Sequence, residues 1–402
     1  MNTPRSSSLS SGMVMLLAAA AGIIVANLYY AQPLVGPIGA ALGLPPAAAG
    51  LIVTLTQIGY TLGLLFIVPL GDLLENRRLI VTGLLVTSGA LVVAATATTA
   101  WAFLLAALAI GLGAVVAQVL VPFAAHLAPE ATRGQVVGKV VSGLLLGIMV
   151  ARPVASVLAG LGGWQTVFGI AAALVALLAV LLHVKLPLRQ PTATQPYRRL
   201  IGSLWPLLTT TVVLRRRALY HAGLFGAFSL FWTVAPQALA GPAFGLSQSA
   251  IAVFALVGMA GAVASPIAGK LADQGHSMGA TAVALALGIA GFALPLLVPG
   301  SRNGALGVLV LASIVLDMGV AGNLVLGQRA IFMLGHEVRS RLNGLYFAVF
   351  FAGGAAGSAL GGWVYAQYGW HAALLAGMAL PALALLYWIG EALPAMATRK
   401  AA

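Results

Sequence analysis

Residues Asn303 to Gln328 form an apolar stretch whose centre reads Val-Leu-Asp317-Met-Gly-Val-Ala-Gly-Asn, with a single carboxylate. A helix of this length rises ~1.5 Å per residue and crosses the ~30 Å hydrocarbon core of a bilayer. Asp317 then lies near the midplane, where an ionised group is costly and usually serves an ion or solute pathway. The alternative is a protonated or paired Asp317 that only ties helices together.

The composition predicts an all-α integral membrane protein. Of 402 residues, 61% are apolar and only 7% are charged, too few to cover the surface of a soluble globule. The absence of cysteine excludes disulfides and thiolate metal sites. Judged on a span of ~20 residues, about twelve apolar runs are expected to cross the bilayer. They lie near residues 13–36, 47–70, 78–98, 101–126, 136–158, 164–184, 218–240, 249–271, 278–299, 303–328, 342–365 and 370–390.

Basic residues predict the orientation. Apart from Arg302, the Lys and Arg residues of the loops and termini fall on one side of the twelve runs, which places both termini in the cytoplasm. This topology explains the net charge of +13 without nucleic acid, because no basic soluble module is present. We therefore expect a multi-pass protein of the cell (inner) membrane, with the lipid bilayer as a partner.

The longest polar interval divides the chain into three parts. Residues 186–217 contain four prolines and two Arg clusters and are read as a cytoplasmic linker. Within it, Tyr197 to Leu214 mixes apolar and basic residues and is expected to lie along the membrane surface. Residues 1–185 and 218–402 then form an N-terminal and a C-terminal six-helix bundle.

The two halves repeat each other. Three residues of the fifth run and its following loop, Gly138, Gly147 and Trp164, recur as Gly344, Gly353 and Trp370 by the same shift of 206 positions. The loop Gly71-Asp-Leu-Leu-Glu75 likewise matches Gly269-Lys-Leu-Ala-Asp273. Matched glycines, tryptophans and carboxylates indicate a gene-duplicated carrier with two pseudo-symmetric bundles.

These motifs resemble those of the major facilitator superfamily (MFS), and within it the twelve-helix drug:proton antiporter branch, over essentially the full chain. The superfamily's loop motif Gly-x-x-x-Asp-Arg-x-Gly-Arg-Arg is similar to Gly71, Glu75, Arg77 and Arg78, with Asn76 where an Arg is usual. The resemblance implies an MFS fold and loops that gate one face of the carrier. The gating group would comprise Gly71, Asp72, Glu75, Arg77, Arg78, Arg133, Gly269 and Asp273.

Two departures from the family pattern direct attention to Arg152. The antiporter motif of the fifth helix keeps only Gly138 and Gly147, and Ala107 occupies the position of the Arg that the family carries in its fourth helix. Arg152 lies inside the fifth run, where it needs a partner, a cavity or an anionic ligand. We expect Arg152 and Asp317 to form the proton-coupling group; the alternative is an Arg that pairs locally with backbone carbonyls.

Polar and aromatic residues on helical stripes are candidates for a substrate cavity. The resemblance implies that the first, fourth, seventh and tenth helices line it, although an aromatic stripe more often packs or faces lipid. The candidates are Asn27, Tyr30, Gln57, Gln118, Phe228, Trp232 and Gln328.

The sequence predicts a secondary active transporter for a small-molecule substrate. Histidines are scattered without metal-ligand spacing, and no nucleotide-binding loop is present, so neither an enzyme nor a metal or other cofactor is expected beyond protons as the coupling ion. Proton-coupled efflux by alternating access, by a monomer with Asp317 as proton carrier, is the first hypothesis. A sugar or metabolite carrier with other ion coupling is the alternative, and a passive channel or a non-transporting receptor is the rival from another class.

Overall fold

The computed structural model describes residues 10–191, 196–297, 301–335 and 339–401, and every regular element in these ranges is a helix. The elements of the N-terminal half are α1 (Ser11–Ala26), η1 (Gln32–Leu34), α2 (Val35–Ala41), η2 (Pro46–Ala48), α3 (Leu51–Phe66), η3 (Val68–Asp72), α4 (Asn76–Thr96), α5 (Ala100–Ala114), α6 (Ala117–Leu127), η4 (Glu130–Thr132), α7 (Arg133–Gly162) and α8 (Trp164–Lys185). Those that follow are α9 (Tyr197–Thr210), α10 (Val212–Ala240), α11 (Gln248–Gly258), η5 (Met259–Val263), α12 (Ala264–Asp273), α13 (Ser277–Leu297), α14 (Arg302–Phe332) and α15 (Arg339–Ala401).

Twelve crossings follow from these elements. Ten described helical stretches are long and apolar enough to span a membrane. The last of them bends at Gly369, where φ is 77°, so that α15 crosses twice. A further crossing begins with the short apolar helix α1 and continues through η1 into α2. The chain is therefore an all-α, multi-pass membrane protein.

The first crossing is broken, whereas the sequence predicts one run over 13–36. Helix α1 ends at Ala26, and the Asn27 side chain donates hydrogen bonds to the carbonyls of Ile23 and Ile24, at 2.9 and 3.0 Å. Pro33, inside η1, has no N–H to continue an α-helical ladder. Turns at residues 27–31 separate α1 from η1 for this reason.

The seventh crossing starts earlier than expected. Helix α10 begins at Val212 rather than near residue 218, so the Arg cluster of the predicted linker is helical. Its Leu214 is fully buried, and Arg217 is buried with its Nη1 donating to the Thr281 hydroxyl at 2.6 Å. These contacts with neighbouring helices extend the helix into the polar segment.

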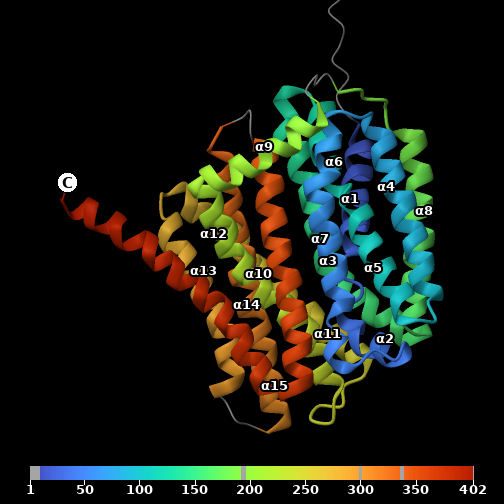
Figure 1. Cartoon of the computed structure of the whole chain (residues 1–402), viewed down its shortest axis with the longest axis vertical. Coiled ribbons are helices and arrows are strands. Elements are labelled where there is room, and N and C mark those ends of the chain that lie inside the picture. Colours follow the sequence, from blue (N-terminus) through green and yellow to red (C-terminus); the bar gives the residue numbers. More distant parts are fainter. Residues whose placement is uncertain (1–9, 192–195, 298–300, 336–338, 402) are drawn as a thin grey trace, which may run out of the picture.

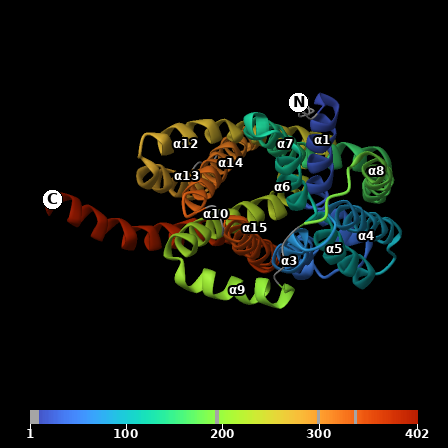
Figure 2. The same cartoon turned by 90° about the horizontal axis from the view of Figure 1, so that it is seen from above.

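The helices gather in two groups, with one helix lying across their end (Figure 1). Helices up to α8 lie on the right of Figure 1 and most of those from α10 onward on the left, with α11 at the lower end between the two groups. Helix α9 crosses the upper end, which we call the α9 end. The view from above shows α9 running along the outside of α10 and α15 (Figure 2). The opposite end, where α2 lies, is called the α2 end.

Helix α9 connects the two groups. Tyr197 donates its hydroxyl hydrogen to the Phe66 carbonyl at 2.8 Å, which ties α9 to the end of α3. Arg341 Nη1, from α15, donates to Ser203 Oγ at 2.9 Å. The amphipathic segment that the sequence predicts within the linker therefore contacts both halves.

The duplicated glycines have equivalent packing roles. A Cβ on Gly147 of α7 would collide with the backbone of Gly22 in α1, and one on Gly353 of α15 would lie 2.5 Å from the Ala222 carbonyl oxygen in α10. Helices α1 and α10 open the two repeats, so each half uses the same close helix–helix approach. Gly138 and Gly344, by contrast, have no heavy atom nearer than 4.0 Å to an added Cβ.

The two halves meet closely along α3 and α15. Gly50 packs against Gly362, and the Thr54 and Ser358 hydroxyls lie 2.8 Å apart. Helix α7 also packs against α11 near the α2 end, and in the described part of the chain no contact of similar extent joins α7 to α12. On that side of the molecule, the halves are in closer contact at the α2 end than at the α9 end.

Candidate site between the two halves

The candidate site lies where one span of each half is interrupted. In the N-terminal half, α1 gives way to turns at residues 27–31, which carry Tyr29. In the C-terminal half, α11 passes into the 3₁₀ segment η5 before α12. Interrupted helices expose polar backbone inside a membrane, and such places commonly hold solute or ion sites.

Trp232 is the centre of this site. Its indole Nε1–H donates a hydrogen bond to Asp317 Oδ1 at 3.2 Å, which joins α10 to α14. The Arg152 guanidinium, from α7, lies over the indole ring with its Cζ 4.1 Å from the centroid. The structure thus brings together the two intramembrane charges that the sequence singled out, around one aromatic side chain.

Two more aromatic rings surround Arg152. Its Cζ lies 4.8 Å from the Phe228 centroid and 6.0 Å from that of Tyr29. A guanidinium over an aromatic face is attracted by the ring quadrupole, and the attraction grows when the site is desolvated. Phe228 and Trp232 were predicted cavity residues; Tyr29 was not, and its neighbour Tyr30 was named instead.

Arg152 is not satisfied by hydrogen bonds. The residue is only 5% exposed, and neither Nε nor Nη1 has an acceptor among the described residues. Arg152 and Asp317 also form no ion pair within 4.0 Å; the ion pairs of the described residues are Arg216–Glu391 and Arg329–Asp273. A buried donor without an acceptor is costly, so these two donor nitrogens require an explanation.

Two glycines let α11 and η5 approach these groups. A Cβ on Gly258 would lie 2.9 Å from the Trp232 ring, and one on Gly261 would lie 2.5 Å from Asp317 Cβ. Any larger residue would push the segment away from the site. The geometry of the site therefore requires glycine at both positions.

The other predicted cavity residues are spread over several places. Gln57 Nε2 donates to Ser229 Oγ at 2.7 Å, and Gln118 Nε2 donates to the Tyr60 hydroxyl at 3.0 Å. Asn27 bonds back to its own helix. Tyr30 lines a groove between α1 and α7 that also contains the exposed Met15 and Val154. Gln328 is partly exposed on α14, far along the helix from Asp317.

Two loop carboxylates of the predicted gating group, Glu75 and Asp273, form local contacts. Glu75 caps α4, accepting from the backbone N–H groups of Arg77 and Arg78 at 2.9 Å and from that of Arg189 at 3.1 Å. Burial would raise the pKa of Glu75, but these N–H donors lower it below its usual range. Asp273 forms an ion pair with Arg329.

The remaining gating residues take other places. Asp72 lines a small pocket shared with Arg341 of α15, so it is the loop carboxylate that faces the other half. Arg77 Nη1 donates to the Leu186 carbonyl and Arg133 Nε to that of Ala125, at 3.2 and 3.1 Å. Arg78 is exposed. Gly71 is buried, and a Cβ there would lie 3.3 Å from Val119; on Gly269 it would meet only Val325, at 3.9 Å.

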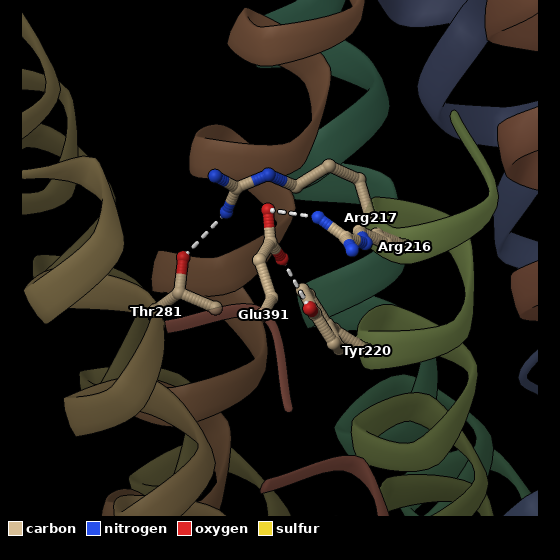
Figure 3. Close-up of polar contacts among 5 residues, drawn as sticks. All are labelled: Arg216, Arg217, Tyr220, Thr281 and Glu391. Atoms are coloured by element: carbon tan, nitrogen blue, oxygen red, sulfur yellow. Dashed lines mark hydrogen bonds and ion pairs between the residues drawn. The ribbon is translucent and has the colours of Figure 1, made fainter. Parts of the chain in front are cut away.

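The sequence analysis missed a polar cluster at the α9 end of the C-terminal half (Figure 3). Glu391 of α15 accepts from the Tyr220 hydroxyl and pairs with Arg216 at 3.1 Å, while Arg217 beside it bonds Thr281. Glu391 follows directly after the last predicted apolar run, 370–390, and so lies outside the predicted crossings. The available signals were the Arg cluster at the start of the seventh crossing and a single carboxylate, Glu391, at the end of the last one.

A second missed contact lies deeper in the same half. His221 of α10 is 1% exposed, and its Nδ1 lies 3.0 Å from Asn323 Nδ2 of α14. The ring stacks on Tyr346, with centroids 5.7 Å apart. The sequence offers no signal for the pairing of His221 with Asn323, because the two residues lie 102 positions apart.

A two-bundle helical membrane protein with one charged, aromatic site between its halves has the architecture of a transporter rather than an enzyme. The chain belongs to the Major Facilitator Superfamily, whose family model matches residues 14–331.

Relatives and solved structures agree with this membership. "Uncharacterized transporter YgaY" of Escherichia coli O157:H7 is 40% identical over 94% of this chain and 95% of the relative. "Probable transporter SCO4007" of Streptomyces coelicolor is 31% identical over 88% of this chain and 82% of that protein.

Two crystal structures share the fold at low sequence identity. A bacterial homologue of the human lysosomal transporter Spinster, in an inward-facing and unoccupied conformation, has a TM-score of 0.73 at 14% identity and covers 96% of this chain and 97% of its own. The nucleoside transporter NupG has a TM-score of 0.70 at 16% identity, covering 94% and 98%.

Proposed function

We propose that this transporter couples the efflux of a small organic solute to protons by alternating access, with Asp317 as the proton carrier. The observation that carries the proposal is the arrangement around Trp232, which bonds Asp317 on one side and lies under Arg152 on the other. Asp317 comes from the C-terminal half and Arg152 from the N-terminal half, so a rocking motion of the halves changes their separation.

Exchange follows from competition at Asp317. A proton or a solute group occupies the carboxylate, and each favours the access state in which it binds better. Because Arg152 and Asp317 each feel the other's charge, loss of the proton also changes the environment of Arg152. Exchange of this kind is what the resemblance to the drug:proton antiporter branch implies.

The loops at the α9 end are proposed to gate this cycle. Glu75 and Asp273 each hold a helix end within one half, and Asp72 faces Arg341 across the boundary between the halves. We place the α9 end and both termini in the cytoplasm of a monomer in the inner membrane, because most loop Lys and Arg lie there.

A second candidate is a metabolite carrier, for uptake or efflux, with a different coupling ion. Arg152 favours it, because its donor nitrogens Nε and Nη1, which have no acceptor among the described residues, match a solute that carries hydrogen-bond acceptors. Ion coupling separates the two candidates.

Transport in proteoliposomes tests the proposal. A thermal-shift screen of the purified protein against cationic drugs, sugars and amino-acid metabolites identifies a solute, whose uptake is then followed under imposed pH and sodium gradients. Accumulation that follows the pH gradient supports proton exchange. Accumulation that ignores it would overturn the proposal in favour of the metabolite carrier.

A further inference from the structure

We propose that the site takes a dipolar solute of amino-acid type, whose carboxylate bonds Arg152 while its ammonium group bonds Asp317. The inference rests on the proposed function, since it assumes that the site around Trp232 binds the transported solute. It adds the charge pattern of that solute: one anionic group and one cationic group, with no net charge.

The carboxylate is assigned to Arg152 because of its unused donors. Nε and Nη1 lack acceptors among the described residues although the residue is only 5% exposed, and the surrounding rings of Trp232, Phe228 and Tyr29 offer only their faces. Aromatic faces stabilise the cation but accept no strong hydrogen bond. A planar carboxylate supplies the hydrogen-bond acceptors that these surroundings lack.

The ammonium group is assigned to Asp317. This carboxylate is partly exposed, and the one hydrogen bond that it accepts from the described residues, from Trp232, occupies Oδ1. Oδ2 is therefore free to accept. An ammonium group donates up to three hydrogen bonds and brings the opposite charge.

The charges of Arg152 and Asp317 are held apart. Arg152 and Asp317 contact the same indole but form no ion pair within 4.0 Å, so neither neutralises the other directly. Two opposite charges that are held apart in a poorly solvated site are best stabilised by a solute with two charges of its own. Its negative group lies beside the positive side chain and its positive group beside the negative one. A purely anionic or purely cationic solute leaves one of them unpaired.

The same geometry supports proton exchange. The ammonium group and a proton both bind the Asp317 carboxylate, so occupation by one excludes the other. The solute adds no net charge, and its carboxylate compensates Arg152 while its ammonium group occupies Asp317. Binding of the solute with release of one proton then follows from the two contacts.

Four charge forms of one skeleton test the proposal. For alanine, leucine and phenylalanine we would compare the free amino acid, the N-acetyl acid, the amino amide and the N-acetyl amide, by calorimetric titration of the purified full-length protein. The zwitterion should bind about tenfold or more tightly than either singly charged form in at least one series. Equal or tighter binding of the anion or the cation, or no binding by any compound, would overturn the inference.

Variants assign each contact. In Arg152→Gln, the amino acid should bind no better than its amide, and in Asp317→Asn, no better than its N-acetyl form. Arg217→Gln, which changes another buried arginine of the same chain, is the matched control and should keep the preference for the zwitterion. Should Arg152→Gln misfold, Arg152→Lys, which keeps the charge, should retain only part of the preference.

These results separate the inference from the proposed function. Proton-driven transport of a singly charged or neutral solute would leave the proton coupling in place and refute the dipolar solute. Zwitterion binding without any coupling to protons would do the reverse. An unchanged preference in Arg152→Gln would refute the assignment of the carboxylate to Arg152.

Discussion

The Gln57 amide donates a hydrogen bond to the Ser229 hydroxyl at 2.7 Å, and this bond joins α3 of one half to α10 of the other. Both side chains are buried, so Ser229→Ala leaves a donor without an acceptor at a cost of ~1–3 kcal/mol. We expect a lower unfolding temperature and wider separation of the halves, measured by thermal unfolding and by inter-spin distances across the α9 end.

The matched control for this change is Ser313→Ala. Ser313 is equally buried, but its hydroxyl bonds the Val310 carbonyl within its own helix. Its loss should leave the distances between the halves unchanged. Equal behaviour of the two variants would show that the Gln57–Ser229 bond does not hold the halves together.

Replacing Trp232 by Phe separates its two roles. The variant keeps an aromatic face for Arg152 but loses the N–H that bonds Asp317. A hydrogen bond to a charged group contributes ~1.5–3 kcal/mol, so kcat/KM for transport should fall about tenfold or more. Trp205→Phe, at a site 71% exposed on α9, is the control. A Trp232→Phe carrier with normal kcat/KM would exclude a functional role for this bond.

A methyl group at Gly261 tests the close packing at the site. In Gly261→Ala the new Cβ would lie 2.5 Å from Asp317 Cβ and 2.7 Å from the Met318 nitrogen, so η5 must move. Overpacking of this kind costs ~1–3 kcal/mol, and both the unfolding temperature and transport should fall. Gly279→Ala, where nothing lies within 4 Å, should change neither. Normal transport by Gly261→Ala would show that the site tolerates displacement of η5.

The carboxylate of Glu75 should make stability depend on pH. Burial would raise its pKa, but the backbone donors of Arg189, Arg77 and Arg78 prevail and lower it. A lowered pKa in the folded state stabilises the fold above the ordinary value of 4.5, and this contribution is lost as pH falls through the folded-state pKa.

Glu75→Gln should therefore unfold at a lower temperature than the parent at pH 7, and the difference should shrink below pH 4.5. Thermal unfolding across this range measures it. Glu130→Gln changes a loop carboxylate that caps no α-helix and serves as the control. A difference that is constant with pH would contradict the capping role.

The sequence predicted the fold well, because its signals are local. Apolar length locates the crossings. The repeated glycines indicated two equivalent bundles, and Gly147 and Gly353 lie at equivalent close helix contacts. The break in the first crossing depends on the Asn27 side chain bonding back to its helix, which length alone does not reveal. That break also determines which of two adjacent tyrosines faces Arg152.

The site was predictable only in part. Asp317 and Arg152 stood out because charges are rare within membrane spans, but their common contact with Trp232 depends on how three helices pack. Partners such as Ser229 for Gln57 and Asn323 for His221 are distant in sequence and carry no local pattern. The roles of Gly258 and Gly261 become visible only in the structure, where they pack against Trp232 and Asp317.

The most direct test of the account is the Asp317→Asn carrier in proteoliposomes under an imposed pH gradient. The amide resembles the protonated acid in shape but cannot release a proton. Its oxygen still accepts a hydrogen bond from the solute, so solute–solute counterflow should persist at a higher half-saturating solute concentration, while uphill transport driven by the pH gradient disappears. Proton-driven accumulation by the Asn variant would contradict the account, because Asp317 would then not be the coupling group.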